Sequence, residues 1–198
     1  RFMDEMKIKD KATRNKAQGY LAKAYIKLTG YESNGGGFDW YGASPADERL
    51  TAYGLLEFMD MKKVYPQVSQ DMIDRTAVWL SNKRDGKGGW KSGSYYGYRN
   101  NSKLHNTYLT YAMSVYGEIN VSAEVNQVTK TALETKDWYC LPLAVMSNWH
   151  IGNKARAADL LDILVKDVNE NGVTNINTKN TMTYSYGRSK NIETWAVI

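Results

Sequence analysis

Two kinds of hydrophobic pattern alternate along the chain, and both predict helices. In the first kind, apolar residues recur every three or four positions between polar ones, as in Ala17, Leu21, Ala24, Tyr25 and Leu28. That spacing is typical of an amphipathic helix with one face on a core and one face in water. It predicts amphipathic helices over 12–29, 69–83, 122–134 and 154–168, the last three with the apolar stripes Met72, Ile73, Thr76, Ala77 and Leu80; Ala123, Val125, Val128 and Leu133; and Leu160, Leu161, Leu164 and Val168.

In the second kind, a helix is apolar nearly all round. Such helices must be covered by protein on every side, because leaving a large apolar side chain in water costs roughly 1.5 to 3 kcal/mol. In the first of them, Ser44 and Pro45 predict an N-cap followed by proline at the first helical position, and Asp47 and Glu48 suit the first turn. The pattern predicts inner helices over 45–61, 103–117, 138–149 and 190–198.

Amphipathic and apolar helices therefore alternate four times, which predicts four hairpins of an outer and an inner helix. An inner helix is covered only when neighbouring hairpins stack beside it, so the repeat predicts an all-α fold with two layers of helices. If the curvature closes, the inner helices form a barrel within the outer ones, an α/α-toroid. If it does not close, the hairpins form an open solenoid.

Glycine-rich turns that end in an aromatic residue precede the first two inner helices. The pair Gly36-Gly37 is followed by Phe38, and the pair Gly88-Gly89, 52 residues later, is followed by Trp90. Glycine allows positive φ and close backbone approach, and the aromatic side chain is expected to tuck against the hairpin. The segment Asn171-Gly172-Val173 is a weaker version of the same turn, and the third hairpin has almost no loop, Thr135 to Asp137.

Composition excludes several classes of protein. No apolar run approaches the ~18 residues that span a bilayer, so direct membrane insertion is not expected. The net charge of +5 comes from 26 basic and 21 acidic residues without a basic run, so nucleic acid is not an expected partner. The single cysteine, Cys140, excludes an intrachain disulfide. Residues 1–4 look like the middle of a longer segment, and residues 194–198 stop inside an apolar pattern without a helix-ending signal, so we expect both ends to lie inside a larger domain.

Several segments, in this order, carry a family resemblance. They are Gly35-Gly-Gly-Phe-Asp-Trp-Tyr-Gly42, Leu50 to Met61, Ile73 to Leu80, Arg84-Asp-Gly-Lys-Gly-Gly-Trp90 and Ile192-Glu-Thr-Trp-Ala196. The series resembles the thioester-containing domain of the alpha-2-macroglobulin and complement family, especially its bacterial members, and most strongly through residue 93. The resemblance implies an α/α-toroid of six hairpins, of which residues 1–198 supply about four as a partial domain.

The same resemblance implies part of a protease-trapping, endopeptidase-inhibiting protein that is extracellular, periplasmic or held in the cell envelope. This domain would scaffold and shield the thioester region, with other domains of the same chain and target proteases as partners. The reactive motif belongs to the preceding hairpin and is absent here. Cys140 stands in Trp138-Tyr-Cys-Leu-Pro142, without the glutamate and glutamine of a thioester, and is predicted to be a small buried residue. Uncovered inner helices predict self-association.

Five carboxylates fall at the loop ends of predicted inner helices, which on a toroid share one rim: Asp39, Asp47, Glu48, Asp85 and Glu193. The simplest interpretation is that they cap helices and turns. The alternative is a toroid enzyme acting on glycans or prenyl groups, which keeps acids at such a rim. Cys140 and His150 stand ten residues apart on one helix, roughly 15 Å by the helical rise, too far to share a metal ion. We therefore predict no catalytic residue, cofactor or metal in this segment.

A few residues remain as candidates for the rim or for an interaction surface. The aromatic cluster from Tyr95 to Tyr98 is either a binding surface or a plug on the rim. The candidates are Asp39, Trp40, Glu48, Trp90, Tyr95, Tyr96, Tyr98 and Glu193.

Overall fold

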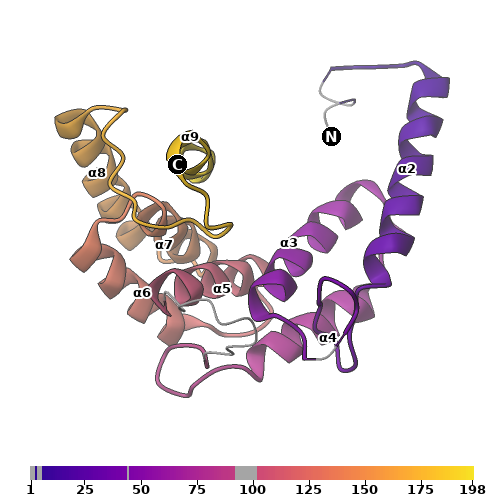
Figure 1. Ribbon diagram of the computed structural model, residues 1–198, viewed down its shortest axis with the longest axis horizontal. Coiled ribbons are helices and arrows are strands. Elements are labelled where there is room, and N and C mark those ends of the chain that lie inside the picture. Colours follow the sequence, from indigo (N-terminus) through magenta and orange to yellow (C-terminus); the bar gives the residue numbers. More distant parts are fainter. Residues whose placement is uncertain (1–2, 4–5, 44, 92–101) are drawn as a thin grey trace. The chain divides into compact units, whose positions relative to one another are not determined.

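The computed structural model describes residues 3, 6–43, 45–91 and 102–198 (Figure 1). Its helices are α2 (Lys11–Thr29), α3 (Glu48–Val64), α4 (Gln70–Ser81), α5 (Ser102–Tyr116), α6 (Ser122–Thr135), α7 (Cys140–His150), α8 (Lys154–Asn171) and α9 (Gly187–Val197). Within the described residues there is no β-strand, and two isolated β-bridges join Glu32 to Phe38 and Arg84 to Trp90. The all-α class is confirmed, and it is consistent with an α/α-toroid built from helical hairpins.

The start of the second helix differs from the prediction. The sequence predicts a beginning at Pro45, but α3 begins at Glu48 and continues to Val64. Asp47 is its N-cap, because one carboxylate oxygen accepts hydrogen bonds from the backbone N–H groups of Arg49 and Leu50, both at 2.9 Å. A carboxylate that binds two otherwise unpaired donors at a helix start outweighs the preference of proline for the first turn.

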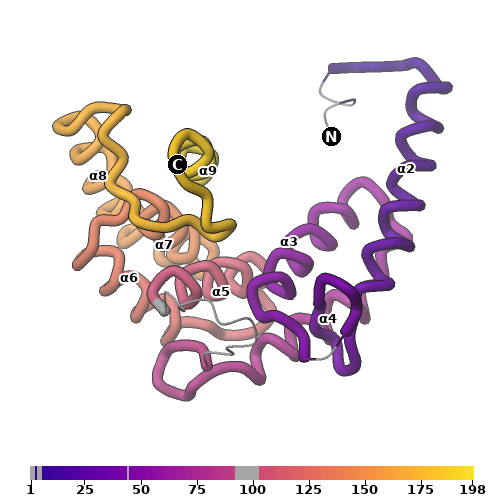
Figure 2. The backbone as a smooth tube through the Cα atoms, viewed as in Figure 1, coloured from indigo at the N-terminus to yellow at the C-terminus, as the bar shows by residue number. Residues whose placement is uncertain are grey.

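The chain divides into two compact units, Arg1–Leu80 and Ser81–Ile198, and each is described by itself. The path of the chain through α2, α3 and α4, and then through α5 to α9, can be followed in Figure 2. That all 198 residues belong to a single partial toroid stays a prediction.

The core of the first unit lies under α3 and α4. The apolar stripe of α4 is buried as predicted, at Met72, Ile73, Thr76, Ala77 and Leu80. Helix α2 differs, because none of its residues is fully buried. Its main anchor is Tyr25, whose ring meets Phe58 edge-on at 6.1 Å and whose hydroxyl accepts a hydrogen bond from the Ser69 N–H. The outer helix is thus held by a few aromatic contacts.

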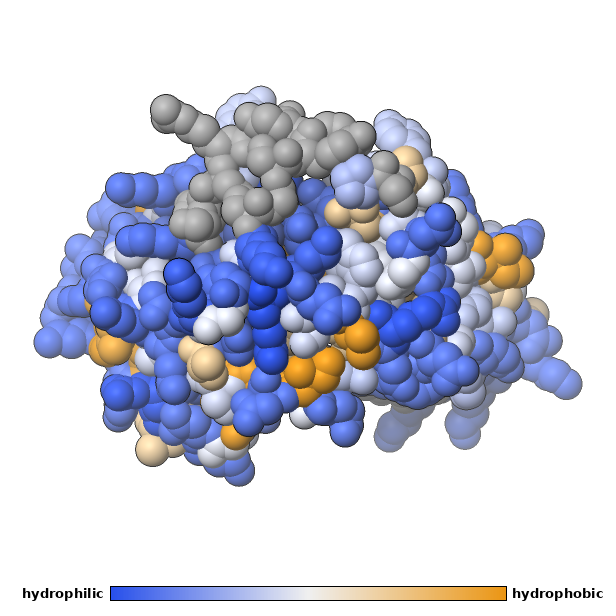
Figure 3. All heavy atoms as spheres, turned by 90° about the horizontal axis from the view of Figure 1, so that it is seen from below, coloured by the Kyte–Doolittle hydropathy of each residue, from blue (hydrophilic) through white to orange (hydrophobic). Residues whose placement is uncertain are grey.

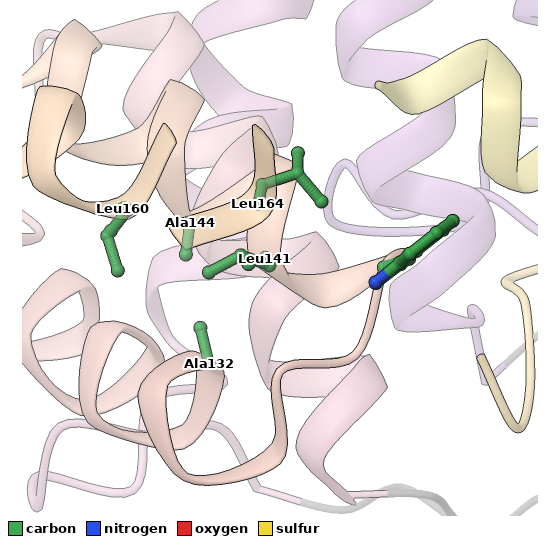
Figure 4. Close-up of a cluster of buried hydrophobic side chains, with 6 residues drawn as sticks. Ala132, Leu141, Ala144, Leu160 and Leu164 are labelled. Atoms are coloured by element: carbon green, nitrogen blue, oxygen red, sulfur yellow. The ribbon is translucent and has the colours of Figure 1, made fainter. Parts of the chain in front are cut away.

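The second unit is centred on α7. This helix packs against α5, α6 and α8, so two of the predicted inner helices, α5 and α7, are neighbours. Figure 4 shows how the core is assembled: Leu141 and Ala144 of α7 meet Ala132 of α6 and Leu160 and Leu164 of α8. A second cluster joins Leu104 of α5 to Tyr139, Cys140 and Leu143, with Val197 of α9 against it. The inner positions predicted for α5 and α7 are therefore realised within this unit.

The inner helices are not covered on every side, and α9 has the uncovered apolar face that the sequence predicts for an inner helix without a neighbouring hairpin. In α9 only Thr194 is buried, while Ile192 is 71% exposed and Trp195 and Ile198 are partly exposed. Tyr53 of α3 and Trp149 of α7 are each 56% exposed. The described residues pack against one side of α9 only, and an apolar sequence by itself does not supply a second neighbour.

The surface carries few large apolar groups on the side drawn in Figure 3, where polar residues predominate and apolar side chains gather in small patches. Among the helices that the structure describes, none is long and apolar enough to cross a membrane.

Candidate functional site

The chain between α2 and α3 folds back on itself in a small turn that is held by backbone hydrogen bonds. The Asp39 N–H donates to the Tyr31 carbonyl at 3.1 Å, and the Ser33 N–H donates to the Gly37 carbonyl at 2.8 Å. The aromatic side chain at its end, Phe38, is buried as predicted, and its N–H donates to the Thr51 hydroxyl of α3 at 2.8 Å. The turn is thereby fastened to the inner helix that follows it.

The turn after α4 repeats this geometry 52 residues later. The Lys91 N–H donates to the Lys83 carbonyl at 2.7 Å, and the Asp85 N–H donates to the Gly89 carbonyl at 3.0 Å. Trp90, in the place of Phe38, is buried, and its indole N–H donates to the Thr110 hydroxyl of α5 at 3.0 Å. The repeat inferred from the glycine spacing is therefore a repeat of structure.

In both turns a glycine is pressed against the backbone of the next outer helix. Gly36 has φ +100°, and a Cβ there would lie 2.9 Å from the Arg75 carbonyl oxygen of α4. Gly88 has φ +83°, and a Cβ there would lie 3.0 Å from the Ala123 carbonyl oxygen of α6. Positive φ and the lack of space both require glycine at these positions.

Each turn also forms an ion pair with that next helix, with opposite polarity in the two copies. Arg75 Nε and Nη2 donate to the two carboxylate oxygens of Glu32 at 2.5 and 2.6 Å. In the second turn Arg84 takes the place of Glu32, and its Nε lies 3.3 Å from the Oε1 of Glu124 in α6. The hydrophobic pattern does not reveal these pairs, although the spacing of 52 between Glu32 and Arg84 is a sequence signal that points to them.

The carboxylates of the two turns are engaged in local structure. Asp39 is 2% exposed, and its Oδ2 accepts hydrogen bonds from the Tyr41 and Ala43 N–H groups. Asp85 Oδ1 accepts from the Lys87 and Gly89 N–H groups, and the hydrogen bond from Lys87, followed by that from Gly89, holds the pKa of Asp85 below its ordinary value. Glu48 is buried in the first turn of α3. Asp39 and Asp85 therefore organise turns, and Asp47 caps α3.

The two tryptophan candidates differ in position. Trp40 is 62% exposed beside the first turn, whereas Trp90 is buried against α5 and under the guanidinium of Arg84, 6.0 Å from its ring centre. Of these two tryptophans, only Trp40 has a side chain exposed enough for a partner to contact. Tyr95, Tyr96 and Tyr98 lie outside the described residues.

Trp40 borders a cavity of about 340 Å³ in the first unit. The cavity lies between the end of α2, the first turn and one face of α3, and half of its lining residues are aromatic. Two carboxyl-bearing residues, Asp39 and Glu57, also line it. It is thus the place where two predicted candidates, Asp39 and Trp40, come together.

Glu193 is the centre of a polar cluster in the second unit. Its Oε1 accepts hydrogen bonds from the Tyr139 hydroxyl at 3.0 Å and the Thr183 N–H at 3.2 Å, and its Oε2 accepts from the Thr183 hydroxyl at 2.6 Å. Partial burial opposes the charged form, but hydrogen bonds from Thr183, Thr181 and Ser185 outweigh it and lower the pKa of Glu193. Burial, reinforced by this negative charge, raises the pKa of the Tyr139 phenol. The cluster ties the segment before α9 to α7 and α9.

Cys140 is buried, as predicted, and burial followed by the charge of Asp137 raises the pKa of its thiol to about 12. It begins α7 and His150 ends the same helix. Asp137 precedes α7, and its carboxylate accepts hydrogen bonds from the Tyr139 and Cys140 N–H groups at 2.9 and 3.1 Å. In the part of the chain that the structure describes, no group of three or more His, Cys, Asp and Glu side chains is placed to hold a metal ion.

Comparison with known proteins points to one family. The model of the A-macroglobulin TED domain, the thioester-containing domain of this family, matches residues 1–140. A comparison with curated proteins found no match. The matched region contains both glycine-aromatic turns and continues to the start of α7. The chain therefore belongs to the A-macroglobulin TED domain family.

Proposed function

We propose that the chain is part of a macroglobulin-like protein that traps proteases, and that this domain is a scaffold that shields the thioester region. The observation that carries the proposal is the family match over residues 1–140. On this proposal the partners are other domains of the same protein and the proteases that the whole protein encloses. The location is extracellular, periplasmic or in the cell envelope, and the protein is of the bacterial type.

A mechanical role for this segment agrees with how its polar groups are used. Asp39, Asp85 and Asp137 bind backbone N–H groups of turns and helix starts, and Glu193 binds neighbouring hydroxyl groups. Cys140 is buried, with a thiol whose raised pKa keeps it protonated. Groups engaged in this way stabilise the hairpins, and we propose that the segment is not itself an enzyme.

The test of the trapping function uses the full-length protein. The protein is incubated with an active protease, and cleavage of a small chromogenic peptide is compared with cleavage of a large protein substrate. A trapped protease keeps its activity on the peptide, loses it on the protein and elutes with the inhibitor from a sizing column. Unchanged digestion of the large substrate, with the protease eluting alone, contradicts the proposal.

A toroid enzyme acting on glycans or prenyl groups is the second candidate, and the observation in its favour is the cavity that Asp39 and Glu57 line. Hydrolysis of a glycan, or turnover of a prenyl diphosphate, that is lost in Glu57→Gln would support it. Activity that survives both Glu57→Gln and Asp39→Asn would exclude this cavity as its site.

We also propose that the chain associates with itself through α9. The exposed Ile192, Trp195 and Ile198 support this, because apolar side chains gathered on one helix favour burial against another surface. Light scattering at rising concentration should show a dimer that Ile192→Asp abolishes. A monomer at every concentration would contradict the proposal.

A further inference from the structure

The cavity of the first unit has walls that are held in place. Phe38 and Phe58 lie with ring centres 5.3 Å apart, and Phe58 is braced in turn by Tyr25. The Phe38 backbone is fixed by its hydrogen bond to Thr51. Gly54 leaves the space in front of these rings open, since a Cβ there would lie 3.7 to 3.8 Å from Phe38 and 3.8 Å from Phe58. The interior is therefore preorganised before any ligand enters.

The mouth of the cavity carries aromatic side chains in contact with water. Trp40 is 62% exposed and Tyr53 is 56% exposed, and both line the cavity together with Tyr31. Exposed aromatic side chains at the edge of a concave site are typical of places where a partner is bound, because they cover a large area and lose little conformational entropy.

The charged residues that line the cavity indicate which kind of ligand it binds. Its charged lining residues are Asp39 and Glu57, and no lysine or arginine is among the described residues that line it. Asp39 is buried and held by two N–H groups of the turn, whereas Glu57 is exposed on α3. Negative charge beside several aromatic faces attracts a cation through both Coulomb and cation–π interactions.

We propose that this cavity binds an arginine side chain presented by a partner protein. A guanidinium group stacks on aromatic faces and pairs with a carboxylate, and it is more weakly hydrated than the ammonium group of lysine. The aliphatic part of the arginine side chain would lie against Leu28 and Leu50, which also line the cavity. A cavity of about 340 Å³ has room for one such side chain and part of its backbone. The site belongs to the first unit and does not depend on protease trapping.

The test compares two short peptides that differ in one group, Ac-Gly-Arg-Gly-amide and the same peptide with the neutral isostere citrulline. Calorimetric titration of the protein gives the affinities, and fluorine NMR of protein labelled with 5-fluorotryptophan locates the site, with the Trp40 signal assigned by Trp40→Leu. We expect saturable binding of the arginine peptide that shifts the Trp40 signal. The citrulline peptide should bind at least about ten-fold more weakly.

Two variants and a matched control complete the test. Glu57→Gln and Trp40→Leu should each lower the affinity for the arginine peptide by about ten-fold. Glu134 is an exposed glutamate of α6, and Glu134→Gln should leave that affinity unchanged. Equal binding of the two peptides, or unchanged binding by Glu57→Gln, overturns the proposal. A dimer that Trp40→Leu dissociates, with no peptide binding, also overturns it, because a second copy would then be the occupant.

Discussion

The guanidinium of Arg75 binds both carboxylate oxygens of Glu32, at 2.5 Å from Nε and 2.6 Å from Nη2. Arg84, at the position equivalent to Glu32 in the second turn, pairs with Glu124 instead. The two copies of the turn thus use reversed charges against the helix that follows. Reversed polarity discourages each turn from docking on the wrong helix, because like charges would then meet.

Glu32→Gln should lower the free energy of unfolding by about 1 kcal/mol, because a bidentate but partly exposed ion pair is weakened. The hydrogen bonds of the pair also raise the pKa of Arg75, so the arginine stays charged across the measurable range. Urea unfolding followed by circular dichroism measures the change.

The exchanged double variant Glu32→Arg with Arg75→Glu is the matched test. It should recover part of the stability that either single reversal loses, as pairs that interact directly do. A double variant no more stable than the worse single variant would show that the pair does not hold the turn.

Gly88→Ala should destabilise the protein more than Gly86→Ala, although both glycines have positive φ in the same turn. A Cβ at Gly86 meets nothing within 4 Å, so that variant bears the backbone strain alone, about 1 to 2 kcal/mol. A Cβ at Gly88 would also lie 3.0 Å from the Ala123 carbonyl oxygen, tighter than an ordinary contact, and we expect about 1 kcal/mol more. Thermal unfolding of both variants in parallel measures the difference, and equal midpoints would refute the close approach.

Glu193→Gln should destabilise the protein at neutral pH by about 1 kcal/mol and have a smaller effect in acid. The pKa of Glu193 is lowered from its ordinary value of 4.5, so its charged form favours the folded state above that pH. This contribution is lost as the pH falls through the lowered pKa. Unfolding midpoints between pH 7 and pH 3 should therefore converge for the two proteins, while Glu134→Gln stays parallel to the parent.

Leu160→Ala should lower the free energy of unfolding by about 2 to 5 kcal/mol, because Leu160 is fully buried between α6, α7 and α8. The neighbouring residue Leu161 is 45% exposed, so Leu161→Ala should change the free energy of unfolding by less than about 1 kcal/mol. The comparison holds composition and helix propensity constant. Similar losses in denaturant unfolding would contradict the orientation of α8.

Cys140 should react slowly with a thiol reagent while the protein is folded. Its thiol is buried, and its pKa is raised to about 12, so little thiolate exists at pH 8. Because Cys140 is the single cysteine, the absorbance of released thionitrobenzoate reports on it alone. Denaturant should bring the rate to that of a free thiol, and fast labelling without denaturant would contradict the burial.

The sequence determined the order and approximate limits of the described helices α2 to α9, because hydrophobic periodicity and caps act over a few neighbouring residues. It also revealed the repeat, since Gly36 and Gly88 mark two turns of the same geometry. The start of α3 was misplaced because Pro45 and Asp47 both favour a helix start, and only their hydrogen bonds distinguish them.

The tertiary structure decided which of several equally apolar residues are buried. Leu160 and Leu161 look alike in the pattern, yet the first packs in the core and the second faces water. It also decided that Glu32 meets Arg75, that Glu193 meets Tyr139, and that Trp40 borders a cavity with Glu57. Local periodicity fixes the face of a helix only approximately. Burial and pairing depend on neighbours far along the chain, and these come together only when the hairpins fold.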